Sequence, residues 1–325
     1  MRARAVVVAV LAGISLLGCD GVFASKPKTK PAPADAVETT APSTPKNASR
    51  SSVHCTPDPA FPTTWQVAEA SAAVELEPRP GEREILVLSD SGNHGEAMTW
   101  PVAGGPLTAL HLELDTVASD DIEGAAWTDG HLFTLTSSGA VRRYTFSAKG
   151  DLVRDRSAYP IGPSPYVCDT LYDGNCGKNY EGLCLRASTK KARCAGYAAS
   201  KTEGTLQCVV LRAGTLAIDT SAAAMTLDVP RNALSDCAFG SAGGPAEDTL
   251  VVTTNIYGGS TTYVVDEASG SLSAIDVHGT PNNEAIAIDR TGALYQFMDS
   301  NTSASSARRE ICTGWSSSPS ASPAN

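Results

Sequence analysis

An all-β fold of the propeller type is the architecture that the sequence predicts for residues 55–315. Short apolar stretches alternate with turns rich in Gly, Ser, Asp and Asn, and three strand candidates follow one another at 84–88, 97–102 and 107–112. Regular strand spacing without a long amphipathic helical pattern is typical of sandwiches, barrels and propellers. A short acidic motif also recurs at separations of 54, 58, 55 and 48 residues. Repeats of this length, with several strands per unit, favour propeller blades.

Each repeat opens with an acidic residue that precedes small or apolar side chains. The five openings are Glu69, Glu123, Glu181, Asp236 and Glu284. A turn and a strongly apolar strand come next, and the apolar strands lie at 85–88, 132–135, 195–199, 250–253 and 294–297. In the second repeat four strands can be placed, at 123–127, 131–136, 141–146 and 151–157.

Five motifs predict five four-stranded blades, and six blades are the alternative if a motif has decayed around 160–178. The last repeat ends after about three strands, near Cys312. We expect residues 64–67, which precede the first motif, to supply the missing strand. Both chain ends would then close the ring and bring Cys55 near Cys312.

The N-terminus has the pattern of a secretory signal, assigned to residues 1–18. Arg2 and Arg4 precede the apolar run 5–17, which is too short for a permanent membrane span. The Leu-Leu-Gly-Cys sequence that ends at Cys19 resembles the lipobox of bacterial lipoproteins. The resemblance implies lipid, such as palmitate, on Cys19 and a place at the bacterial cell envelope, on its periplasmic or outer-membrane face. The alternative is an ordinary signal with an unrelated cysteine.

Two segments lack the composition of a folded core. Residues 19–54 are rich in Pro, Ala and Thr, and 316–325 are rich in Ser and Pro. Such stretches bury too little apolar surface to offset their chain entropy. We therefore expect a disordered spacer after the lipid anchor and a disordered tail.

Cysteine usage fits export. Eight of the nine cysteines remain after Cys19 is set aside, and an even number in an oxidising compartment favours disulfides over free buried thiols. Closure of the ring suggests the first pair below, a short loop the second and a hairpin the third, and the fourth follows by elimination. The predicted pairs are Cys55–Cys312, Cys168–Cys176, Cys194–Cys208 and Cys184–Cys237.

The charge pattern excludes nucleic acid as an expected partner. The chain carries a net charge of −10, and no basic run exceeds a pair of residues. Nucleic-acid binding requires a basic face. The membrane is thus expected to be contacted through lipid, and other partners would be an envelope protein or a small molecule.

Two motifs carry a resemblance to known propellers. Residues 121–127, followed by 132–135, resemble the D-x-E-G blade entry of esterase-like phytase propellers, as do residues 179–183. Residues 86–94 resemble the strand end of NHL-type repeats. The phytase resemblance implies calcium near the ring opening. This chain differs from phytases in having no basic cluster for an inositol polyphosphate.

The propeller fold predicts that the acidic motifs surround one mouth of the central axis, with polar turns just outside. Blade joining through backbone N–H groups is the expected role of these acids, since it would satisfy buried polar groups. A cationic ligand is one alternative, and calcium held by Glu123, Glu181 and Glu284 is another. The mouth candidates are Glu69, Glu123, Glu181, Asp236, Glu284, Asp90, Asn93, His94, Asn255 and Asp299.

Catalytic motifs are absent from the sequence: it has neither H-E-x-x-H nor G-x-S-x-G, and its five histidines are scattered. We therefore expect a non-catalytic binding or scaffold module at the envelope. The acidic mouth and the resemblance support an alternative, a calcium-dependent propeller hydrolase of a phosphate ester or related ester. A quinone-dependent dehydrogenase is a third interpretation.

Overall fold

The computed structural model describes residues 49–187, 193–256, 259–277, 282–300 and 303–315. The chain divides into two units, Met1–Ala41 and Pro42–Asn325, and all described residues belong to the second. The predicted signal, Cys19, the spacer up to residue 48 and the tail 316–325 lie outside the described residues. The described part is all-β and contains no helix, hence none able to cross a membrane.

Three sheets are antiparallel meanders whose strands follow chain order. The first contains β3 (Ala70–Arg79), β4 (Glu82–Ser89), β5 (Glu96–Pro101) and β6 (Thr108–His111). The second contains β7 (Ile122–Thr128), β8 (His131–Thr136), β9 (Ala140–Phe146) and β10 (Leu152–Pro160). The third contains β11 (Tyr180–Leu185), β12 (Gly196–Ser200), β13 (Thr205–Arg212), β14 (Thr215–Ile218) and the short β15 (Met225–Thr226).

The fourth sheet joins two meanders through the N-terminal strand. One meander contains β16 (Leu234–Phe239), β17 (Leu250–Ile256), β18 (Gly259–Asp266) and β19 (Ser271–Asp276). The other contains β20 (Asn283–Ile288), β21 (Leu294–Met298) and β22 (Ser305–Thr313). Between them lies β1 (Ser49–Pro57), parallel to β19 and antiparallel to β22, while β2 (Thr64–Trp65) pairs with β22.

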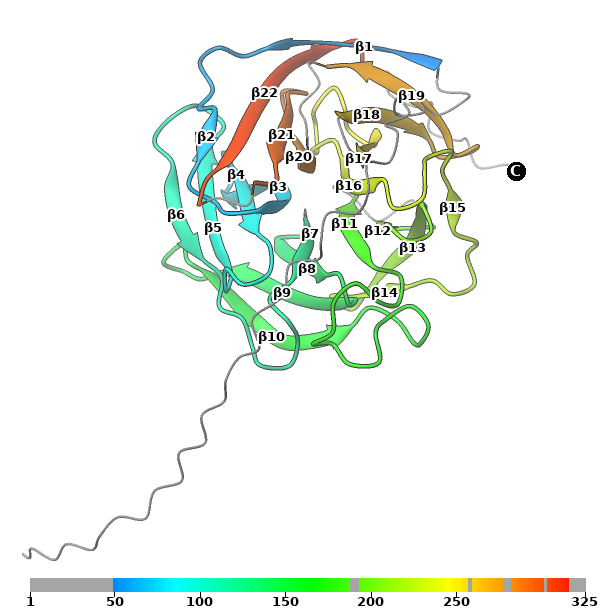
Figure 1. Cartoon of the computed structure of the whole chain (residues 1–325). Coiled ribbons are helices and arrows are strands. Elements are labelled where there is room, and N and C mark those ends of the chain that lie inside the picture. The colour runs from blue at the N-terminus through cyan, green and yellow to red at the C-terminus, as the bar shows by residue number, and fades with distance from the viewer. Residues whose placement is uncertain (1–48, 188–192, 257–258, 278–281, 301–302, 316–325) are drawn as a thin grey trace, which may run out of the picture. The chain divides into compact units, whose positions relative to one another are not determined.

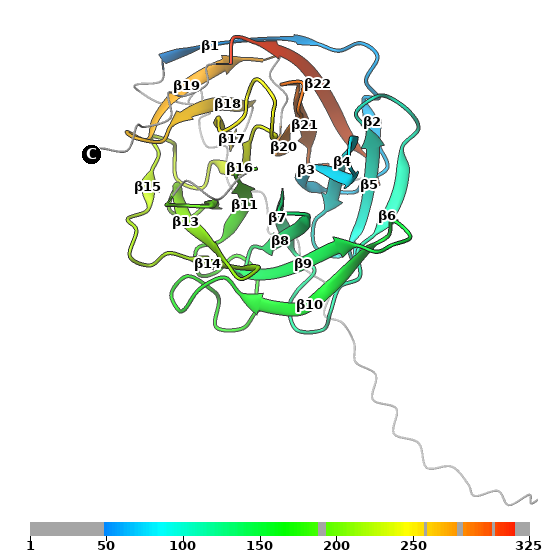
Figure 2. The same cartoon turned by 180° about the vertical axis from the view of Figure 1, so that it is seen from behind.

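The first strands of the meanders surround a common axis, which defines a β-propeller (Figure 1). β3, β7, β11, β16 and β20 each contact the next, and β20 contacts β3 to close the ring. The view from behind shows the later strands of each meander further from the axis (Figure 2). Inner strands dominated by small and apolar residues permit this arrangement, since both faces of every sheet pack against a neighbour.

The ring is closed by β1 rather than by residues 64–67, which corrects the predicted closure. Cys55 lies opposite Cys312 in the β1–β22 ladder, and residues 64–65 form only a short bridge to β22. Residues 49–54, expected in the disordered spacer, are part of β1. Their polar sequence hides the strand because only Val53 and Cys55 of β1 are buried, and sheet pairing supplies the remaining order.

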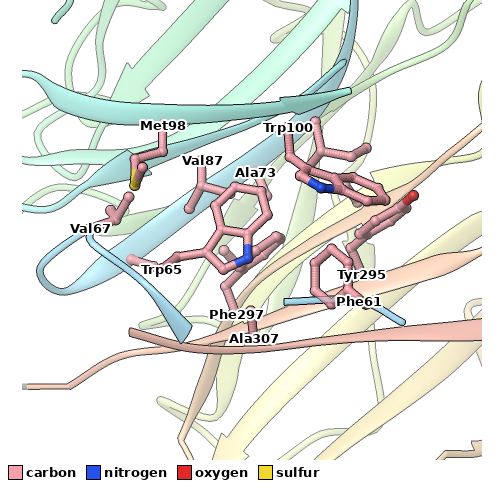
Figure 3. Close-up of a cluster of buried hydrophobic side chains, with 14 of the residues drawn as sticks. Phe61, Trp65, Val67, Ala73, Val87, Met98, Trp100, Tyr295, Phe297 and Ala307 are labelled. Atoms are coloured by element: carbon pink, nitrogen blue, oxygen red, sulfur yellow. The ribbon is translucent and has the colours of Figure 1, made fainter. Parts of the chain in front are cut away.

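An aromatic cluster seals the seam between the first meander and the last (Figure 3). The ring centroid of Phe61 lies 5.1 Å from that of Trp100, and Trp65 lies 5.0 Å from Phe297. Trp65 is fully buried. Large aromatic rings bury much apolar area, so the segment before β3 fastens the N-terminal part of the chain into the ring.

Four disulfides cross-link the domain. They are the pairs predicted from the sequence: Cys55–Cys312, Cys168–Cys176, Cys184–Cys237 and Cys194–Cys208. Cys55–Cys312 ties β1 to β22 across a sequence separation of 257 residues. Disulfides persist in oxidising compartments, so this framework indicates an extracytoplasmic location.

Candidate functional site

A repeated backbone bond frames the mouth, which is the end of the axis where the inner strands begin. A backbone N–H at the end of the second strand donates to the carbonyl just before the first strand; the donor follows the strand in four meanders and lies within β17 in the remaining one. We call these the turn and entry positions. The turn–entry pairs are Asp90–Glu69, Ser137–Asp121, Lys201–Asn179, Asn255–Ala233 and Asp299–Asn282.

A third position, two residues after the entry position, interrupts the ladder of every inner strand. The register shifts there in all five meanders, so a bulge places one extra residue at the mouth. The bulge positions are Ser71, Glu123, Glu181, Ser235 and Glu284. Three of the five acidic motif residues therefore share one structural position.

The other two acidic motif residues occupy different positions, which corrects the equivalence drawn from the sequence. Glu69 is an entry residue, equivalent to Asp121 rather than to Glu123. Asp236 lies one residue beyond its bulge and is almost fully buried. Its carboxylate accepts N–H bonds from Cys237 and from Ile286 of the next inner strand, both at 2.7 Å. Asp236 thus joins two inner strands and is not a mouth residue.

Two serines at bulge positions join neighbouring meanders through backbone carbonyls. The Ser71 hydroxyl donates to the Ile122 carbonyl at 2.5 Å, and the Ser235 hydroxyl donates to the Asn283 carbonyl at 3.0 Å. Within the described ranges, Glu181 and Glu284 accept hydrogen bonds only from side chains. The expected backbone N–H bond therefore holds for Asp236, whereas Glu284 joins two meanders through the Asn255 amide and Glu181 is bonded within its own meander.

Three carboxylates converge on one side of the mouth, and we call them the open acidic cluster. One oxygen each from Asp90, Asp121 and Glu123 lies within 4.8 Å of the others. Ser137 donates its hydroxyl to Asp121, and the Ser91 N–H donates to Asp90. No ion pair found among the described residues involves any of the three. Negative charge is therefore concentrated here without a paired cation.

The electrostatics of the open acidic cluster follow from burial and mutual repulsion. Burial, then the neighbouring Asp121 and Glu69, raise the pKa of Asp90 to about 7 despite the Ser91 bond. The pKa of Glu123 is raised well above its usual value by burial, then by Glu181 and Asp90. Both pKa values are raised because the ionised carboxylates are partly removed from water and have no cation beside them.

The opposite side of the mouth contains an internal cation, and we call Glu181, Lys201, Asn255 and Glu284 the lysine cluster. The Lys201 ammonium donates to Glu181 at 2.8 Å. Burial opposes the charge on Lys201, but Glu181, Glu284 and Glu123 outweigh it and raise the pKa of Lys201. Burial still raises the pKa of Glu181 to about 7, with Lys201 acting against it.

Amides complete the lysine cluster. Asn255 donates to Glu284 at 2.6 Å and to Asn282 at 2.8 Å. Asn282 in turn donates to the carboxylate of Asp299 at 3.2 Å. Burial raises the pKa of Glu284, with Lys201 and Asn255 opposing the shift. Each acid on this side therefore has a polar or cationic partner.

The remaining predicted mouth residues lie at the rim beside the open acidic cluster. Asn93 donates to Glu69 at 3.2 Å. His94 is largely exposed, and its Nδ1 lies 3.0 Å from Asp120 Oδ2. Asp120 also accepts the N–H groups of Gly92 and His94. Asp120 thus fixes the turn that follows β4.

A loop constrained by a disulfide passes beside Asp121 at the mouth. A Cβ added to Gly174 would lie 3.1 Å from Asp121 Oδ2, so the loop passes close to that carboxylate. Backbone bonds join Ser138 to Cys168 and Ser119 to Leu171, which anchors the loop to the second meander. Cys168–Cys176 constrains the same segment.

The residues able to hold a metal ion differ from the expected set. Glu123 is common to both, whereas Asp90 and Asp121 replace Glu181 and Glu284 in the group that converges. Asp121, Asp120 and Lys201 were not among the predicted site residues. Asp121 could have been found, since it begins the D-x-E-G motif. Lys201 was missed because the predicted strand ended at residue 199, whereas β12 ends at Ser200.

Comparison with known proteins assigns this chain to no family. No known protein family matches the chain, and no curated protein matches it. Solved structures resemble it at low identity. A putative 6-phosphogluconolactonase from Bacteroides fragilis is 13% identical, with 71% of this chain and 78% of that chain covered and a TM-score of 0.41. A streptogramin B lyase is 9% identical, with 80% and 97% covered and a TM-score of 0.37.

A putative oxidoreductase (glucose dehydrogenase) from Thermus thermophilus is 12% identical, with 75% of this chain and 97% of that chain covered and a TM-score of 0.40. These similarities are too low to transfer an activity. The function must therefore be argued from this chain's own residues.

Proposed function

We propose that this protein is an exported, lipid-anchored propeller of five blades that serves as a binding module, and that its mouth binds a cation. Asp90, Asp121 and Glu123 are the proposed ligands. Calcium is the proposed ion, because it favours carboxylate oxygens and accepts irregular coordination. The ring of five inner strands supports the blade number.

The convergence of three carboxylates without an ion pair is the observation that carries the proposal. Burial raises the pKa values of Asp90 and Glu123, and repulsion from the neighbouring carboxylates adds to that effect. A divalent cation would reverse the repulsion and displace protons from these groups. Calcium binding should therefore release protons near neutral pH.

A calcium titration of the mature protein tests the proposed site. We expect the melting temperature to rise with calcium and the rise to disappear in Glu123→Gln, since a folded-state ligand stabilises by mass action. Glu96→Gln is the matched control, because Glu96 is exposed and lies outside the cluster. Calorimetry in buffers of different ionisation enthalpy measures the released protons. An unchanged melt of the parent at millimolar calcium would refute the site.

The anchor is supported by the lipobox-like sequence and by the disulfides. Cys19 lies outside the described residues, so the test is chemical. Metabolic labelling with a fatty-acid analogue should mark the parent and not Cys19→Ala. A labelled Cys19→Ala would refute the lipid attachment.

A calcium-dependent hydrolase of a phosphate ester or related ester is the second candidate. It is favoured by Asp90, whose pKa of about 7 suits a general acid or base at neutral pH. Turnover of a phosphate monoester that requires calcium and is lost in Asp90→Asn would support it. Calcium binding without any turnover would exclude the hydrolase and support the binding module.

A further inference from the structure

A cavity of about 270 Å³ lies at the opposite end of the axis from the mouth. All five inner strands line it with residues near their ends, such as Ala126 of β7 and Ala238 of β16. Most of the lining side chains are apolar, seven of them are alanines, and Trp127 and Phe239 add aromatic surface. A volume just below the usual range of ligand pockets suits a compact molecule.

The inner strands provide hydrogen-bonding groups around this cavity. β3, β7, β11, β16 and β20 each have a strand neighbour on one side only. On the unpaired edge of an antiparallel strand, alternate residues direct N–H and C=O groups away from the sheet. Some of these groups are used within the protein, as the Ile288 carbonyl accepts the Ser241 hydroxyl at 2.9 Å, and the rest can offer a ligand donors and acceptors that carry no net charge.

The charged side chains of the cavity argue against an anion. Arg83 Nη1 is held by Glu75 at 3.2 Å and Nη2 by Glu77 at 3.4 Å. Glu75 also accepts the Arg290 N–H at 3.3 Å, and burial raises its pKa despite Arg83. Asp129 adds a further carboxylate. The lining thus has a single basic residue, Arg83, and three acidic ones. We therefore expect it to repel a phosphate or a carboxylate.

We propose that this cavity binds a small uncharged molecule rich in hydroxyl groups, of monosaccharide size. A hydroxyl can both donate and accept, so it matches a wall that offers both kinds of backbone group. The carbon–hydrogen faces of such a molecule suit the alanine side chains and the two aromatics. This site shares no residue with the open acidic cluster and does not depend on cation binding there.

Ligand titration with and without a blocked entrance tests the proposal. D-glucose, D-galactose and D-mannose are the probes, with gluconate and glucose 6-phosphate as anionic counterparts, measured by calorimetry and saturation-transfer NMR on the mature protein. We expect saturable binding of at least one neutral sugar. Ala242→Trp, at an exposed position of the lining, should weaken it at least tenfold.

Ala148→Trp is the matched control, because Ala148 is exposed and does not line the cavity. If Ala242→Trp does not fold, Ala187→Phe blocks the same entrance from the third meander. Absence of binding by all three sugars would overturn the proposal. Sugar binding that is retained in both entrance variants would also overturn it, as would tighter binding of gluconate or glucose 6-phosphate than of the neutral sugars.

Discussion

The two sides of the mouth use the same backbone frame and reach opposite electrostatic states. In the open acidic cluster the turn positions contribute Asp90 and Ser137, and neither supplies a positive charge to Asp121 or Glu123. In the lysine cluster the turn positions contribute Lys201 and Asn255, which hold Glu181 and Glu284. The residue at the turn position thus decides whether a carboxylate at the mouth has a cationic or hydrogen-bonding partner within the protein.

This difference separates a structural part of the mouth from the part that we propose binds a cation. On the lysine side the carboxylates are paired or hydrogen-bonded. Removing one partner of the Lys201–Glu181 pair would leave a buried charge, so this side stabilises the fold. The open acidic cluster lacks that pairing. Four measurements can break or sharpen the contrast.

Removing the internal cation should have the largest effect. Lys201→Met leaves Glu181 without its ammonium partner, and we expect a loss of about 2–3 kcal/mol in unfolding free energy at pH 7. Arg79→Met, which breaks an exposed pair with Glu82, should cost less than about 1 kcal/mol. Urea denaturation measures both. Equal losses in the two variants would show that the lysine cluster is no more than a surface contact.

Transferring the cation to the other side should convert one cluster into the other. Asp90→Lys places an ammonium at the turn position that Lys201 occupies in the third meander. We expect a gain of about 2 kcal/mol in the calcium-free protein and the loss of any calcium-induced rise in melting temperature. A calcium response that survives in Asp90→Lys would contradict the assigned ligands.

The pH dependence should distinguish charge from packing. The pKa of Asp90 is about 7 in the folded protein, above its usual value of 3.8, so the folded state binds the proton more tightly. The contribution of Asp90 to stability is therefore full below about pH 4 and declines as pH rises through about 7. Asp90→Asn should exceed the parent by about 1.5 kcal/mol at about pH 8 and match it at about pH 4.

Denaturation of both proteins at the two pH values, without calcium, checks this expectation. An advantage of Asp90→Asn that is the same at both pH values would assign the effect to packing. A decline of stability with pH should remain in the variant, since the pKa of Glu181 is also about 7.

The smallest effect should come from the amide of the lysine cluster. Asn255→Asp removes the donor to Glu284 and Asn282 and adds a charge, and we expect a loss of about 1 kcal/mol at pH 7. Asn232→Asp is the control, because Asn232 is an exposed turn residue. Thermal unfolding measures both, and a loss no greater than that of Asn232→Asp would remove Asn255 from the cluster.

Much of the fold could be predicted from local patterns. The recurring acidic motif identified the five inner strands, since small residues after an acid repeat at the start of each. The strand from 49 to 57 could not be predicted, because its order comes from pairing with β19 and β22 rather than from its own apolar pattern.

The sequence by itself determined the repeated all-β architecture; it suggested the four cysteine pairs, which the disulfides confirm, and predicted an acidic ring opening. Only the tertiary structure decided which acids share a position, because strand pairing shows Glu123 at the bulge of its inner strand and Asp236 one residue beyond the bulge of its own. It also brought Asp90 beside Asp121 and Lys201 beside Glu181. Electrostatic pairing depends on distance and burial, and both are set by packing between strands far apart in the chain.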